Sequence, residues 1–117
     1  RLSLARALAL RPGLLLLEEP LAAVDELTRD VLQEELSSLW RQAGFTGVLV
    51  THNVHEAVYL SNRVVVMSPR PGRVLDVIEV PFEFPRQPEL RASAGFAALT
   101  GQVTAVLRGQ HRAEASA

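Results

Sequence analysis

Short runs of mainly apolar residues alternate along this chain with longer stretches of helical periodicity. Four leucines at 14–17 are bounded by Pro12 and Pro20, and further short runs cover 48–51 and 64–67. Such runs between turn residues are typical of strands buried on both faces of a parallel sheet, although length alone does not exclude a buried helical turn. The prolines favour a strand at 14–17.

Apolar residues recur at three- and four-residue steps in the longer stretches. One such stretch begins after Asp25 and stops at Gly44, and another covers 90–108. Helices are also expected over 1–10 and directly after Asn53, which opens a capping-box pattern. Alternating strands and helices of this kind predict an α/β fold with a mostly parallel sheet flanked by helices.

The second half of the chain carries three further patterns. The strand at 64–67 and the apolar stretch 74–80 are joined by a turn rich in proline and arginine, which predicts an antiparallel hairpin. Residues 81–88 form an extended connector interrupted by prolines. Residues 109–117 form a polar, alanine-rich tail, which we expect to be frayed.

Two adjacent carboxylates, Glu18 and Glu19, directly follow the leucine run. Successive side chains of a strand point to opposite faces, and the carboxyl ends of parallel strands form the ligand-binding edge of an open α/β sheet. One carboxylate at this edge could hold Mg²⁺ through water while the other orients or deprotonates an attacking water. The alternative is a strand that ends in a solvated acidic turn.

Two more polar residues stand at the ends of predicted elements. Asp25 precedes a helix, and its side chain is well suited to cap that helix. His52 follows the strand at 48–51, where an imidazole could serve a ligand or act only as a structural hydrogen-bonding group. The order of His52, His55 and Glu56 does not match the known zinc-binding helix motifs, so a zinc site is not expected.

Composition narrows the possible functions. The 117 residues carry a formal net charge of −1, which argues against a nucleic-acid partner held by electrostatics. Cysteine is absent, so disulfides and thiolate metal sites are excluded. No apolar run approaches the roughly 18 residues of a membrane span. The sequence also has neither a lysine nor a glycine-rich run, which together would form a phosphate-binding loop.

Three segments in this order resemble the second half of the ATPase subunit of an ATP-binding-cassette (ABC) transporter. Glu18-Glu19-Pro20 resembles the Walker B box with its catalytic glutamate, Leu21 to Asp25 resembles the D-loop, and Val50-Thr51-His52 resembles the switch-histidine loop. The stretch from Met67 to Arg73 is more similar to the nitrate, sulfonate and taurine importer branch than to the sugar or amino-acid branches.

The resemblance implies a role for each candidate residue. Glu18 would act on Mg²⁺ through water, and Glu19 would be the catalytic base. His52 would be a catalytic residue that also contacts the γ-phosphate of ATP, and Asp25 would contact the nucleotide site across a dimer interface. The family usually has Asp where this chain has Glu18, and the longer side chain shifts the carboxylate outward by about one C–C bond, so we expect slower hydrolysis and not lost binding.

The resemblance also implies the architecture and the partners. We expect a P-loop NTPase fold, in which 1–80 is the C-terminal half of the ATPase domain and 81–117 is a connector, a helix and a tail. ATP and Mg²⁺ are the implied cofactors. The implied partners are a second ATPase subunit, transmembrane permease subunits and, indirectly, a periplasmic solute-binding protein, at the cytoplasmic face of the inner membrane. Nucleic acid is not an expected partner.

The chain begins at Arg1 without a methionine and lacks both the P-loop and the signature loop, so we interpret it as a fragment that is inactive alone. Two other classes remain open. One is a non-catalytic interaction fragment. The other is an ABC-type ATPase of DNA repair or chromosome maintenance, which we would expect beside long heptad arms and basic surfaces.

The absence of a phosphate-binding loop leads to a first prediction. Because no row of backbone N–H groups can hold the triphosphate, the 117-residue chain alone should bind Mg-ATP negligibly. Titration calorimetry at millimolar nucleotide should show only heats of dilution, with an ABC ATPase that contains its P-loop as the positive control. A clear stoichiometric isotherm from this chain would refute the expectation.

Overall fold

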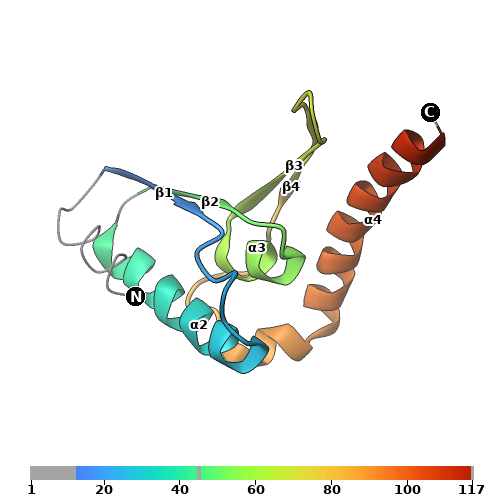
Figure 1. The fold of residues 1–117 in the computed structure, drawn as a ribbon. Helices are drawn as coiled ribbons and strands as arrows, with labels where there is room; N and C mark the ends of the chain where they lie inside the picture. The colour runs from blue at the N-terminus through green and yellow to red at the C-terminus, as the bar shows by residue number, and fades with distance from the viewer. Residues whose placement is uncertain (1–12, 45, 117) are drawn as a thin grey trace. The chain divides into compact units, whose positions relative to one another are not determined.

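The computed structural model describes residues 13–44 and 46–116 (Figure 1). The helix expected over 1–10 lies outside these residues. The described chain forms two compact units, one ending at His52 and the other beginning at Asn53. In chain order the elements are β1 (Leu14–Glu18), α2 (Glu26–Ala43), β2 (Thr46–Val50), α3 (Val54–Leu60), β3 (Arg63–Met67), β4 (Val74–Glu79), the 3₁₀ helix η1 (Pro88–Ala92) and α4 (Ala94–Ser116).

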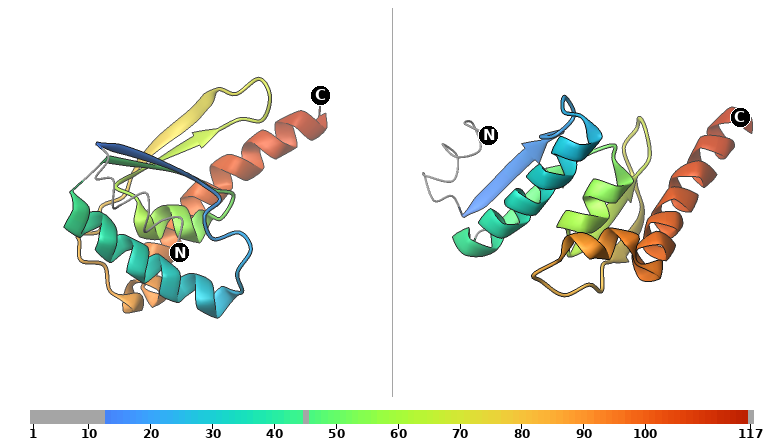
Figure 2. Two further views of the ribbon diagram at one scale, coloured as in Figure 1. Left: turned by 60° about the vertical axis from the view of Figure 1, so that its left-hand side comes forward. Right: turned by 90° about the horizontal axis from the view of Figure 1, so that it is seen from below.

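In the first unit, β1 and β2 form a parallel pair, as the apolar runs predicted. The register runs from Leu14 opposite Thr46 to Glu18 opposite Val50. Figure 2 shows α2 lying along one face of this pair. The expectation of burial on both faces is wrong for the described structure, because Leu14 is 62% exposed and Leu16 is 61% exposed. Among the described residues of this unit, a helix covers one face of the two strands and leaves the face of Leu14 and Leu16 exposed.

Helix α2 begins and ends where the sequence predicted. Asp25 is its N-cap, and Gly44 ends it in the left-handed conformation with φ 67° while its N–H donates to the carbonyl of Trp40 at 3.2 Å. The indole of Trp40 packs directly on the backbone of Gly47 in β2. A Cβ atom at position 47 would lie 1.3 Å from Cζ2 of Trp40, so only glycine permits this approach.

In the second unit, β3 and β4 form the expected antiparallel hairpin, with a register shift between Val66 and Met67. The expected third parallel strand at 64–67 is present as β3, but its pairing partner among the described residues is the antiparallel β4. A short turn permits only antiparallel pairing, whereas a parallel neighbour needs a long crossover. The ion pair from Arg63 Nε to Glu79 Oε1, at 2.9 Å, joins the open end of the hairpin.

Helix α4 packs against α3, β3 and β4, and it carries two buried side chains of the core, Phe96 and Val103. The helix expected over 90–108 is divided in two, because Ser93 is extended between η1 and α4. The hydroxyl of Ser93 donates to the carbonyl of Leu90 at 2.7 Å and accepts the N–H of Phe96 at 3.1 Å. The tail at 109–117, which was expected to be frayed, is helical over its described residues, since α4 continues to Ser116.

A buried arginine ties the connector to the end of α3. Arg86 is only 7% exposed, and its Nη1 donates to the carbonyls of Val58, Tyr59 and Ser61 at 2.8–2.9 Å. Its Nε and Nη2 donate to the carbonyl of Phe82, and the hydroxyl of Tyr59 donates back to the carbonyl of Arg86 at 3.0 Å. These bonds satisfy carbonyls that the last turn of a helix leaves without partners. Burial lowers the pKa of Arg86 to about 10, so the side chain remains charged at neutral pH.

Replacement of this arginine should destabilise the protein. Arg86→Met keeps most of the apolar volume but leaves several buried carbonyls without donors, which should lower the free energy of unfolding by about 2–4 kcal/mol. Urea unfolding followed by circular dichroism measures the change. The control is Arg70→Met, since Arg70 is exposed in the hairpin turn and should tolerate the same change. Equal stabilities of the two variants would show that the Arg86 network contributes little.

Candidate functional site

The carboxyl ends of β1 and β2 bring Glu19 close to the strand that precedes His52. Glu18 is the last residue of β1 and pairs with Val50, and the N–H of Glu19 donates to the carbonyl of Val50 at 2.8 Å. Glu19 itself has φ 44°, which is uncommon for a residue other than glycine. The backbone therefore turns sharply at Glu19, immediately after the last ladder position.

Glu19 and His52 interact directly through their side chains. Nδ1 of His52 is hydrogen-bonded to Oε1 of Glu19. The side chain of Glu19 is 35% exposed, whereas that of His52 is 96% exposed. The two residues are 33 positions apart, and the parallel register of β1 and β2 explains why they meet. The structure thus joins the two residues for which the sequence predicted catalytic roles.

Glu18 lies on the exposed face of β1, which it shares with Leu14 and Leu16. Mg²⁺ is commonly held by one or two carboxylates together with water and phosphate oxygens, so a single exposed carboxylate at this edge fits such an ion through water. Among the described residues, no group of three or more His, Cys, Asp or Glu side chains could hold a metal on its own. The site thus offers a carboxylate for a metal but no closed metal cage.

The same residues fit ATP only in part. The exposed imidazole of His52 could reach a terminal phosphate, and the Glu19 carboxylate beside it could face a water. A cradle for the other phosphates needs successive backbone N–H groups from a glycine-rich loop, and the sequence has no such run.

Asp25 is the N-cap of α2, which confirms the capping interpretation of this residue. Its Oδ1 accepts the N–H of Thr28 at 2.8 Å, and its Oδ2 accepts the Thr28 hydroxyl at 3.1 Å. The backbone hydrogen bond from Thr28, followed by its hydroxyl bond, lowers the pKa of Asp25 below the ordinary value of 3.8. Both carboxylate oxygens therefore have partners within the helix, and in the described part of the chain the structure does not bring Asp25 together with the Glu19–His52 pair.

Arg29 has a structural role that the sequence pattern did not predict. Nη2 of Arg29 donates to the carbonyl of Val24 at 3.0 Å, and its Nε reaches the carbonyl of Leu21 at 3.4 Å. These bonds hold the segment from Leu21 to Asp25 against the first turn of α2. A cation is unfavourable near a helix N-terminus, so its presence there could have signalled this contact.

The Asp25 cap should make stability depend on pH in acid. Because the folded pKa of Asp25 is lowered, its contribution is complete above the unfolded pKa of about 3.9 and is lost as pH falls through the lower folded value. Asparagine at position 25 is also a good N-cap but does not titrate. As pH is lowered from about 5 to 2.5, the stability of the Asp25→Asn variant should therefore fall less than that of the parent protein. Thr28→Val, which keeps the N–H but loses the hydroxyl, should lie between them. Thermal melts across this range test the order, and identical slopes in all three proteins would contradict it.

Comparisons with known proteins show clear similarity to transporter ATP-binding proteins, although no family model matches the chain. The chain is 46% identical over 109 residues to the aliphatic sulfonates import ATP-binding protein SsuB 1 of Rhizobium johnstonii, which covers 93% of this chain and 38% of that protein. It is 49% identical over 86 residues to the aliphatic sulfonates import ATP-binding protein SsuB of Bacillus cereus, covering 74% of this chain and 34% of that protein.

A third relative comes from an archaeon. An uncharacterized ABC transporter ATP-binding protein of Methanocaldococcus jannaschii is 48% identical over 86 residues, covering 74% of this chain and 32% of that protein. The chain therefore spans about a third to two fifths of the length of these relatives. Identity at this level over most of the chain is decisive: the chain belongs to the family of ABC transporter ATP-binding proteins.

Proposed function

We propose that this chain contributes the water-activating edge of an ATPase that drives an ABC importer. The observation that carries the proposal is the hydrogen bond between Glu19 and His52 at the carboxyl ends of two parallel strands. This edge is where open α/β sheets bind ligands. The names of the relatives, which include aliphatic sulfonates import ATP-binding proteins, support transport as the process that the ATPase drives.

The three residues at this edge divide the chemistry. Glu19 accepts a proton from the attacking water, and its bond to His52 holds the carboxylate in place. His52, which is almost fully exposed, contacts the terminal phosphate. Glu18, on the exposed face of β1, is the residue that would hold Mg²⁺ through water. Bound ATP would supply the phosphoryl group, and Mg²⁺ would neutralise charge on its oxygens.

The remaining assignments follow from the same proposal. Asp25, held at the start of α2, contacts the site of a second ATPase subunit through the segment that it ends. Residues 1–80 form part of the ATPase domain, and 81–117 follow it. The assembly includes membrane permease subunits and acts at the cytoplasmic face of the membrane on solutes such as sulfonates, nitrate or taurine. Within the described residues no helix combines the length and apolar character needed to cross a membrane.

Substitutions of the two glutamates separate their roles, in a longer protein that joins this chain to a P-loop segment. Glu19→Gln keeps the shape but removes the base, so ATP should still bind while hydrolysis falls by about 10²–10⁴-fold. Glu18→Gln should instead weaken the Mg²⁺-dependent part of ATP affinity. Glu18→Asp restores the shorter side chain usual in the family and should keep or raise the rate.

ATPase rates and ATP affinities with and without Mg²⁺ measure both effects. The matched control is Glu26→Gln, because Glu26 is an exposed carboxylate in the first turn of α2 and should be silent. Equal losses of rate and affinity in Glu18→Gln and Glu19→Gln would mean that the roles are divided wrongly. A parent protein without ATPase activity would refute the proposed function itself.

A further inference from the structure

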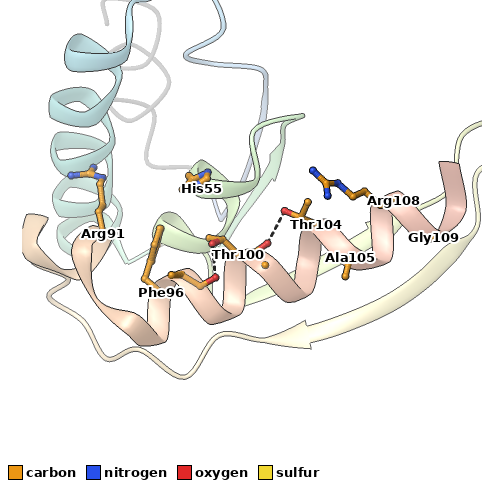
Figure 3. Close-up of a pocket in the computed structure, with 10 residues that line it drawn as sticks. His55, Arg91, Phe96, Thr100, Thr104, Ala105, Arg108 and Gly109 are labelled. Atoms are coloured by element: carbon orange, nitrogen blue, oxygen red, sulfur yellow. Dashed lines mark hydrogen bonds between the residues drawn. The ribbon is translucent and has the colours of Figure 1, made fainter. Parts of the chain in front are cut away.

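A groove in the second unit lies outside the site at the ends of β1 and β2. Its volume is about 570 Å³, within the range of small-molecule pockets, and it is formed by α3, η1 and α4 (Figure 3). The chemistry of its lining comes from two rings, two hydroxyls and two guanidinium groups. These belong to His55, Phe96, Thr100, Thr104, Arg91 and Arg108.

The apolar part of the groove runs along one face of α4. Ala97, Gly101 and Ala105 follow one another at helical spacing and line it with small side chains. A Cβ atom at Gly101 would meet nothing within 4 Å, so this position opens onto free space. The ring of Phe96 lies beside that of His55, with centroids 5.9 Å apart. Phe96 itself is only 1% exposed, so the accessible surface for a flat or short aliphatic group comes from His55 and these small side chains of α4.

The charged part of the groove is cationic. Arg91 and Arg108 both line it, and none of the ten lining residues is acidic. The guanidinium carbon of Arg91 lies 4.0 Å from the ring centroid of Tyr59, and the Tyr59 hydroxyl is held by the carbonyl of Arg86. Stacking of this kind restrains an arginine, so less conformational entropy is lost when it binds.

The hydroxyl groups of the two threonines already donate hydrogen bonds within α4. The hydroxyl of Thr100 donates to the carbonyl of Ala97 at 3.1 Å, and that of Thr104 donates to the carbonyl of Thr100 at 2.7 Å. Figure 3 shows both hydroxyl bonds along the helix between Arg91 and Arg108. Since these protons are already used, the two guanidinium groups are the permanently charged donors in the lining.

From these contacts we propose that the groove binds a small organic anion that has one acidic group and an apolar body. The acidic group pairs with Arg108 at the end of the groove, and the body lies over Gly101 against His55, whose ring rests beside the buried ring of Phe96. The apolar lining disfavours an inorganic anion, and the two arginines disfavour a neutral molecule of the same shape. The proposal does not depend on ATP binding or hydrolysis, because all lining residues belong to the second unit.

A titration of the ¹⁵N-labelled 117-residue chain with benzenesulfonate, followed by amide chemical shifts, tests this site. Saturable shifts should centre on Gly101, Thr104 and Ala105. Benzenesulfonamide has nearly the same shape without the charge, and sulfate has charge without the ring, so each should bind at least about tenfold more weakly. Equal binding of either compound, or shifts centred on other elements, would overturn the proposal.

Three variants complete the test. Arg108→Gln should weaken benzenesulfonate binding by about tenfold. Gly101→Leu places a side chain in the open space of the groove and should abolish the saturable shifts. Arg70→Gln removes an exposed arginine from the hairpin turn and should leave the affinity unchanged. The proposal fails if Arg108→Gln and Arg70→Gln have the same effect, or if dilution of the ligand-free chain shifts the groove amides, since a second copy would then occupy the groove.

Discussion

The parallel pairing of β1 with β2 is the constraint on which the candidate site depends. Its register sets Glu18 opposite Val50, and the next hydrogen bond, from Glu19 to the carbonyl of Val50, extends the ladder by one residue. A shift by one residue would turn each side chain to the other face of the strand. The contact between Glu19 and His52 is therefore a consequence of strand register, and neither residue could establish it through local structure.

Close packing of Trp40 on Gly47 supports that register from the helical side. The indole occupies the space that a side chain at position 47 would need, so α2 approaches β2 at one particular point. Asp25 and Arg29 organise the other end of α2, where they hold the first turn and the segment that leads into it. Contacts at both ends thus fix the position of α2, and they also fix the conformation of the segment between β1 and α2.

The second unit depends on a different interaction. The guanidinium group of Arg86 donates hydrogen bonds to carbonyls at the end of α3 and to the carbonyl of Phe82. One charged side chain thus supplies the hydrogen-bond donors that the helix end lacks. A cation in this position also complements the negative end of the helix dipole. Because Tyr59 is held by the same network and in turn supports Arg91, the arrangement connects the core of the unit to the cationic groove.

The sequence by itself determined the local elements and the identity of the site residues. The apolar runs, the caps at Asp25 and Asn53 and the stop at Gly44 were predictable because each depends on neighbouring residues alone. The family resemblance named Glu18, Glu19 and His52. Tertiary structure decided the rest: that Arg86 donates to carbonyls at the end of α3, and that Glu19 meets His52. These outcomes depend on hydrogen bonds and contacts between residues far apart in the chain. The pattern of side chains along one segment does not predict such contacts.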